Sequence, residues 1–175
     1  MFTRARLLFG FVLALCAAPL LADKLVFDHR LVPALKAVLD SGDPAMISYD
    51  NRNPRNVVDL IAVRGKSAQD WQEALVIIAR LPDKKIVTPA DWRAQLQRDA
   101  AKQCPAVFTT IAQDANSVTF ERRSTGCRAG YPPVALYRVA AGKPSLFLLA
   151  AMTKSDFSPA ARAQWLALMA SAHLE

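Results

Sequence analysis

Residues 104–127, with the sequence CPAVFTTIAQDANSVTFERRSTGC, decide the fold that we expect for this chain. Two runs rich in β-branched and aromatic residues flank a polar turn at 114–117, a pattern that predicts a β-hairpin. Along an antiparallel hairpin, the residue numbers of any two facing residues add up to the same value, and the centre of the turn sets that value. The numbers of Cys104 and Cys127 add up to the value set by the turn at 114–117, so the two cysteines should face each other. The sequence therefore predicts a disulfide between Cys104 and Cys127 that closes the open end of the hairpin and contributes about 3 kcal/mol to stability.

The first 22 residues have the layout of a secretory signal peptide. Arg4 and Arg6 precede an almost unbroken apolar run at 7–21, and the small residue Ala22 comes just before a charged pair. This run is too short for a comfortable membrane span. We therefore expect cleavage after Ala22, export to the periplasm, and no stable membrane span in the mature protein.

The mature chain is expected to have 153 residues and a net charge of +5, because Arg4 and Arg6 leave with the signal peptide. It keeps two cysteines, an even count that suits an oxidising compartment. Acidic residues are spread along the chain, and no long run of basic residues occurs. A nucleic acid is therefore not the expected partner, whereas an acidic protein or an anionic envelope surface fits this charge.

The hydrophobic pattern predicts a single α+β domain over residues 23–175, in which helices pack on a mainly antiparallel sheet of five or six strands. The expected strands are 57–63, 73–81, 107–112, 117–123, 134–140 and 145–152. The run at 73–81 could also be helical, because Trp71, Leu75 and Ile78 would then share a face. Its β-branched residues favour a strand. The last strand is apolar on both faces, so we expect it at the centre of the sheet.

Three helices and one helical turn complete the predicted domain. They are expected at 30–41, from Thr88 to the residue before Cys104, from Ser158 onward, and as a short turn at 67–72. Thr88 and Ser158 are each followed by proline, which is the usual order of an N-cap and the first helical position. Residues 50–56 have no periodicity and are expected to form a polar loop.

No catalytic motif stands out, and we expect no metal or other cofactor. His29 and His173 lie near opposite ends of the mature chain, and neither has a partner at metal-ligand spacing. A disulfide would leave no free thiolate for cysteine catalysis. Acids that converge only in the fold would still allow a hydrolase, and the available ones are Glu73, Glu121, Asp91 and Asp156.

The segment from Gly126 to Pro133 is the strongest candidate for a binding site. A disulfide at one end and two prolines at the other would hold it rigid, which lowers the entropy lost on association. Arg128 and Tyr131 within it are residue types that often anchor protein interfaces. The full set of candidate contact residues is Arg122, Arg123, Arg128, Tyr131, Arg52 and Arg55.

Short motifs along residues 57–174 resemble a group of small exported proteins of Gram-negative bacteria. They are Asp70-Trp71-Gln72-Glu73 before a strand, Cys104-Pro105 after a helix, and Ser158-Pro159 opening a helix with Trp165-Leu166. Some small exported proteins of this kind are immunity factors, which block a rival's cell-envelope toxin in the periplasm. The resemblance implies such a role and assigns no functional residue.

These observations favour a periplasmic, non-enzymatic binding protein, most concretely an immunity-type inhibitor of an envelope-targeting toxin or hydrolase. The expected partner is another protein. Two alternatives stay open: an envelope hydrolase built from converging carboxylates, and a carrier that holds a small apolar ligand between sheet and helices. The oligomeric state is not predicted.

Overall fold

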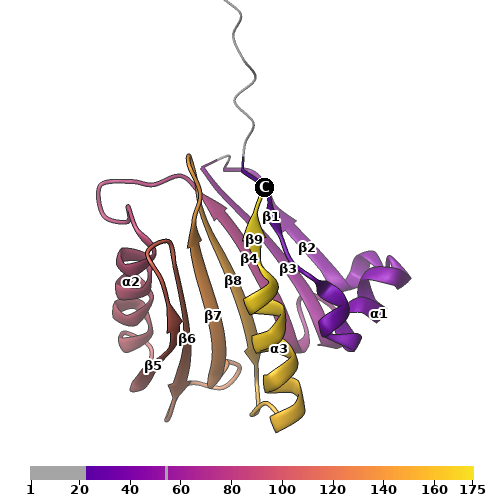
Figure 1. Ribbon diagram of the computed structural model, residues 1–175. Coiled ribbons are helices and arrows are strands. Elements are labelled where there is room, and N and C mark those ends of the chain that lie inside the picture. The colour runs from indigo at the N-terminus through magenta and orange to yellow at the C-terminus, as the bar shows by residue number, and fades with distance from the viewer. Residues whose placement is uncertain (1–22, 54) are drawn as a thin grey trace, which may run out of the picture.

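The computed structural model describes residues 23–53 and 55–175, and its main element is a seven-stranded antiparallel sheet (Figure 1). The strand order is β2-β3-β4-β8-β7-β6-β5. The strand bounds are β2 Ile47–Asp50, β3 Asn56–Gly65, β4 Trp71–Arg80, β5 Ala106–Gln113, β6 Ser117–Ser124, β7 Val134–Ala141 and β8 Leu146–Thr153. The α+β class is confirmed, but the count of five or six strands is wrong. The expected signal peptide lies outside the described residues.

The strands that the sequence pattern does not predict are the shortest ones. β2 has four residues, and Ile47 faces Ile61 of β3 at the edge of the sheet. β1 (Leu25–Val26) and β9 (His173–Leu174) form a separate two-stranded sheet that joins the two ends of the described chain. Segments of two to four residues are too short to show an alternation of polar and apolar side chains, which explains why the pattern did not reveal them.

Each of the three helices begins with proline, as predicted after Thr88 and Ser158, whereas the helix predicted at 30–41 begins only at Pro33. They are α1 (Pro33–Ser41), α2 (Pro89–Ala101) and α3 (Pro159–Ser171). Two single 3-10 turns, η1 (His29–Leu31) and η2 (Pro44–Met46), lie on either side of α1. The predicted N-cap at Thr88 is confirmed, because its hydroxyl accepts from the backbone N–H of Asp91. The Asp91 carboxylate also accepts from the backbone N–H of Thr88, which completes a capping box.

The predicted helical turn at 67–72 is wrong. The Ser67 hydroxyl accepts from the backbone N–H of Asp70, but the chain then enters β4 at Trp71. Pairing with β3, in which Trp71 faces Gly65, extends β4 over this segment. The choice of a strand for residues 73–81 is confirmed, since they fall almost entirely within β4.

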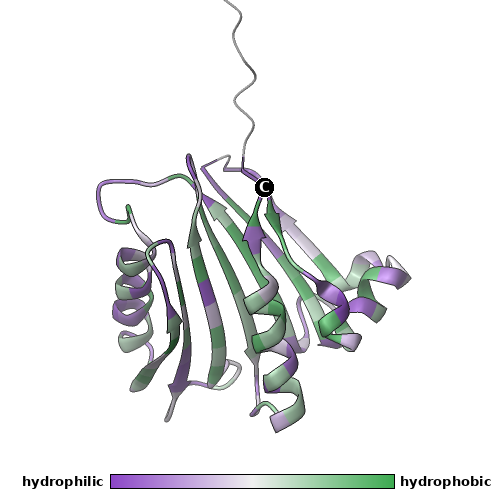
Figure 2. Cartoon of the chain, viewed as in Figure 1, coloured by the Kyte–Doolittle hydropathy of each residue, from purple (hydrophilic) through white to green (hydrophobic). Residues whose placement is uncertain are grey.

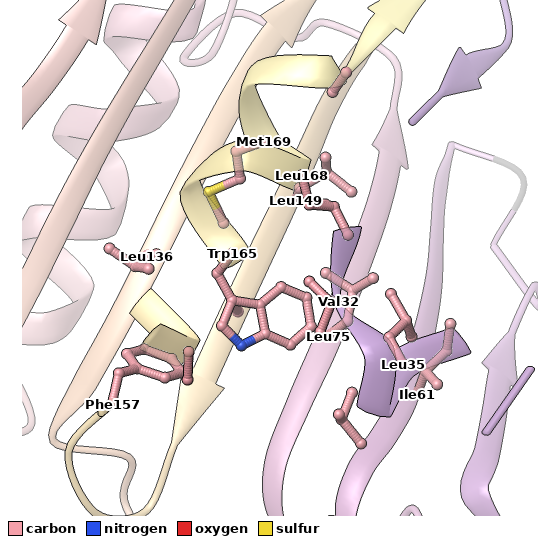
Figure 3. Close-up of a cluster of buried hydrophobic side chains, with 14 of the residues drawn as sticks. Val32, Leu35, Ile61, Leu75, Leu136, Leu149, Phe157, Trp165, Leu168 and Met169 are labelled. Carbon is pink, nitrogen blue, oxygen red and sulfur yellow. The ribbon is translucent and has the colours of Figure 1, made fainter. Parts of the chain in front are cut away.

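Helices cover both faces of the sheet, so the molecule has two apolar cores (Figures 1 and 2). On one face, Trp165 and its neighbours on α3 pack against β4, β7 and β8 (Figure 3). On the other, Trp92 of α2 packs with Phe120 and Tyr137, whose rings stack 4.9 Å apart. β8 is the middle strand of the seven and is buried on both sides, as its sequence predicts.

Candidate functional site

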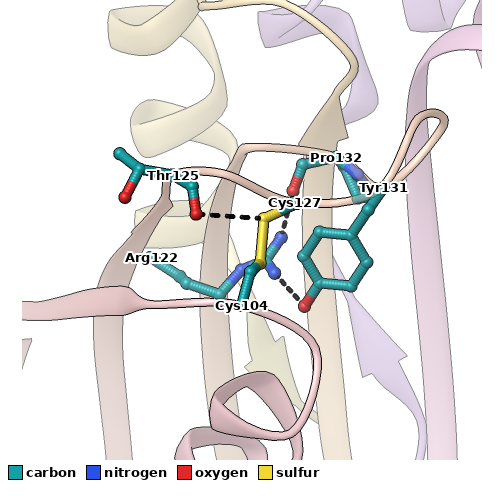
Figure 4. Close-up of a disulfide and its surroundings, with 6 residues drawn as sticks. All are labelled: Cys104, Arg122, Thr125, Cys127, Tyr131 and Pro132. Carbon is teal, nitrogen blue, oxygen red and sulfur yellow. Dashed lines mark hydrogen bonds between the residues drawn. A yellow bond between two sulfur atoms is a disulfide. The ribbon is translucent and has the colours of Figure 1, made fainter.

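The disulfide between Cys104 and Cys127 is present, with Cα atoms 5.0 Å apart (Figure 4). It lies just beyond the last paired residues of the hairpin formed by β5 and β6, Ala106 and Ser124. Next to it, the backbone N–H of Thr125 donates to a carbonyl oxygen of the facing segment at 3.0 Å. The bond therefore links the end of α2 to the segment that follows β6.

The predicted register of the hairpin holds only beside the turn. There Gln113 faces Val118, with the predicted sum of residue numbers. A bulge near Ile111 shifts the rest of β5 by one residue, so that Thr110 faces Phe120. The cysteines still meet because both lie past the end of the ladder, where the chain no longer follows strand register.

Residues 126–133, which we call the clamped loop, are fixed at both ends. Cys127 holds the first end through the disulfide. At the second end, the Arg122 guanidinium lies over the Tyr131 ring, 4.6 Å from its centre, and donates to the Tyr131 hydroxyl and to the Pro132 carbonyl oxygen at 2.6 Å (Figure 4). Between these two ends, the side chain of Arg128 is exposed.

The middle of the clamped loop is itself a tight turn. The backbone N–H of Tyr131 donates to the carbonyl oxygen of Arg128 at 3.2 Å. Gly130 has a φ of 83°, a conformation that glycine adopts without steric cost. Arg128, Ala129 and Gly130 are exposed to solvent on this turn, and the turn restricts the conformations that their backbone can adopt.

Arg122 is not an exposed contact residue, which corrects one part of the predicted site. Only 2% of its surface is exposed, because it shares the α2 face of β6 with Val118 and Phe120. The alternation of β6 already contained this signal, since Arg122 follows those two apolar residues at a period of two. In the structure, Arg122 stabilises the clamped loop through its contacts with Tyr131 and Pro132.

Arg123 points to the opposite face of β6, beside α3. Its guanidinium pairs with Asp156 at 2.9 Å and lies 2.7 Å from Glu121. Hydrogen bonds from Arg123 lower the pKa of the Asp156 carboxyl group. Arg123 remains exposed at the same end of the sheet as the clamped loop, although its charge is already balanced by these two acids.

Arg52 and Arg55 do not belong to the same surface as the clamped loop, which corrects a second part of the predicted site. Both lie in the turn between β2 and β3. The register across β3, β4, β8, β7 and β6 places that turn level with the start of β6, whereas the clamped loop follows its end. The six candidate residues are therefore divided between opposite ends of the sheet.

We expect the clamped loop to lose much of its rigidity in the variant Arg122→Met, which removes the two donors and keeps an apolar side chain of similar length. Hydrogen exchange of the Tyr131 amide should become at least about tenfold faster, because even one of the two lost charged hydrogen bonds contributes about that much. Tyr131→Phe is the control for the single hydroxyl contact and should have a smaller effect. Unchanged exchange in Arg122→Met would show that the disulfide alone orders the loop.

Glu73 and Glu121 are the buried acids among the four candidates, and a side chain of α3 binds each of them. Glu73 of β4 accepts from the Trp165 indole N–H at 2.7 Å, and Glu121 of β6 accepts from Arg162 at 2.7 Å. Each of these two acids therefore fixes one side of α3 to the sheet. Glu121 also lies beside the exposed Asp156, because both carboxylates contact the guanidinium of Arg123, at 2.7 Å and 2.9 Å. Asp91 is engaged at the start of α2.

The space between α3 and the sheet is filled by side chains. Trp165, Leu168 and Met169 have no exposed surface (Figure 3). A hollow of about 500 Å³ next to β1 and β9 is an open surface depression, and the polar side chains of His29, Arg30 and His173 line part of it.

Within residues 23–53 and 55–175 no three histidine, cysteine or acidic side chains are grouped as metal ligands would be. No helix in those ranges has the length and apolar character of a membrane span.

Comparison with known proteins adds no family: no protein-family model and no curated protein sequence matches the chain.

Proposed function

We propose that this protein is exported and acts as a non-enzymatic inhibitor of the immunity type, which binds a cell-envelope-targeting toxin or hydrolase. The observation that carries the proposal is the clamped loop, held by the disulfide at Cys127 and by Arg122 at Tyr131 and Pro132. A loop that is ordered before binding loses little entropy when it docks on a partner. Inhibitors that fill an enzyme cleft commonly bind with little change in their backbone.

Arg128 gives the clamped loop its chemical preference. Its side chain is exposed and has no ion pair with another described residue, unlike Arg123 close by. An exposed arginine at the start of a rigid turn suits a cleft that contains carboxylates, because the guanidinium donates two parallel hydrogen bonds to such a group. Hydrolases that cleave glycosidic bonds carry a pair of carboxylates in their cleft.

Export is supported by two independent observations. The Cys104–Cys127 disulfide suits a compartment in which thiols are oxidised. The N-terminal 22 residues have the order of charge, apolar run and small residue that secretory signals share.

Capture from an envelope extract tests the proposal. The immobilised exported protein should retain a protein partner, and Arg128→Glu should weaken that binding at least tenfold, as expected for an interface anchor. Arg55→Glu makes the same charge change at the other end of the sheet and should leave binding unaltered. If Arg128→Glu captured as well as the wild type, the clamped loop would not be the contact site. Turnover of peptidoglycan without any captured protein would favour a hydrolase instead.

A further inference from the structure

The end of the sheet opposite the clamped loop carries basic side chains that have no acidic partner. The β2–β3 turn, the loop at 81–88 and the β7–β8 turn all lie at this end (Figure 1), and the backbone N–H of Leu81 donates to the carbonyl oxygen of Arg55. Its exposed cations without an ion pair, which define what we call the basic end, are Lys24, Arg55, Lys84, Lys85 and Lys143, and a sixth exposed cation, Arg52, is paired with Asp50. None of the five forms an ion pair with another described residue.

The carboxylates of the basic end are already engaged in the local structure. Asp83 accepts hydrogen bonds from two backbone N–H groups of its own loop and from Arg80. Asp50 pairs with Arg52, and Asp23 accepts from the backbone N–H of Lys143. At the same end, Asp114 accepts from the backbone N–H groups of Asn116 and Ser117, and Glu175 lies 3.6 Å from the His173 ring nitrogen. These acids keep their charge, but none of them lies within ion-pair distance of the five cations, so the lysine side chains remain available to a negatively charged surface.

Exposed aliphatic side chains accompany these cations. Leu81 and Val87 are 39% and 57% exposed and lie on either side of Lys84 and Lys85. Ile86, between them, is 5% exposed and packs into the core beneath α2. The loop is therefore anchored to the domain while it presents both charge and apolar surface outward, the combination that binds at a membrane–water interface.

The chain enters the described structure at this same end. The backbones of Lys24 and Glu175 exchange two hydrogen bonds, and Asp23 lies against the β7–β8 turn. In the sequence, one residue separates Asp23 from the apolar run at 7–21. A bilayer that receives that run during export would be within reach of the basic end.

We propose that the basic end binds the surface of an anionic lipid bilayer and directs the clamped loop away from it. The basic side chains meet the negative headgroups, and Leu81 and Val87 enter the boundary between headgroups and acyl chains. Each basic residue near such a surface strengthens binding roughly fivefold at moderate salt. A protein held in this orientation would offer its other end to a partner that works at the envelope.

Vesicle flotation tests the proposal with the exported protein, after its N-terminus is determined by mass spectrometry. It should bind vesicles that contain phosphatidylglycerol, and not pure phosphatidylcholine, with an affinity that falls as salt is raised. Lys84→Glu/Lys85→Glu should weaken binding at least about 25-fold, two fivefold steps. The control Lys66→Glu/Arg128→Glu changes the net charge equally at the opposite end and should retain most of the binding.

Three results would overturn the proposal: no binding to anionic vesicles, equal binding to neutral ones, or equal loss in both double variants. Binding of heparin or of another soluble polyanion with the same loss in Lys84→Glu/Lys85→Glu would also count against it, since a bilayer would then not be the specific ligand. Lipid binding and partner capture can be told apart in these experiments. Arg128 is replaced in the variant that should keep lipid binding, whereas the same residue is the anchor whose replacement should weaken partner capture.

Discussion

Replacing Trp165 with alanine is expected to lower the free energy of unfolding by about 4 kcal/mol, the usual cost of removing a buried tryptophan. Trp165 has no exposed surface and belongs to the same buried cluster as Val32, Leu75 and Leu136 beneath α3. Its indole N–H also donates to the buried Glu73. The substitution leaves both a cavity and a carboxylate whose remaining partner, Arg64, is 3.7 Å away.

Urea denaturation followed by circular dichroism measures this effect. Trp71→Ala is the matched control, because Trp71 is half-buried and makes its aromatic contact with the surface residue Lys154. We expect that control to cost about 1 kcal/mol, the value of an exposed cation–π contact with some lost packing. Similar losses in the two variants would show that α3 is not held as described.

Removing the disulfide with Cys104→Ala/Cys127→Ala is expected to cost about 3 kcal/mol of stability in oxidising buffer. The two cysteines are 23 residues apart in sequence, and closing a loop of that length restricts the unfolded chain by about this amount. In a strong reductant the wild type should become about as unstable as the double variant. A stability difference that survives reduction would mean that the substitutions act through packing and not through the loss of the bond.

The elements that local chemistry specifies were predictable from the sequence. Thr88 and Ser158, each followed by proline, indicated where α2 and α3 begin. The side chain of the cap accepts a hydrogen bond from a backbone N–H of the first turn, and proline has no N–H that needs a partner there. The apolar run of β8 indicated a central strand, since only a strand covered on both faces can bury such a sequence. The disulfide was predicted from a turn and two cysteines at matching distances from it, although the bulge near Ile111 breaks the register that this prediction assumed.

The arrangement of distant segments was not predictable in the same way. The pairing of β4 with β8 brings together strands about 75 residues apart, and no local pattern encodes that choice. For this reason the sequence grouped Arg52 and Arg55 with the clamped loop, although the sheet places them at its opposite end. The alternation in β6 could have predicted that Arg122 faces the core. It could not predict the contact of Arg122 with Tyr131, because the position of the Tyr131 ring depends on the fold of the loop.

Site-specific crosslinking tests most directly the claim that the clamped loop is the surface that meets a protein partner. A photoreactive amino acid is placed at position 128 in one variant and at Lys36, exposed on α1, in another. Irradiation of cells that export each variant should give a covalent complex with another protein from position 128 and none from position 36. A complex that forms from position 36, with none from position 128, would contradict the account.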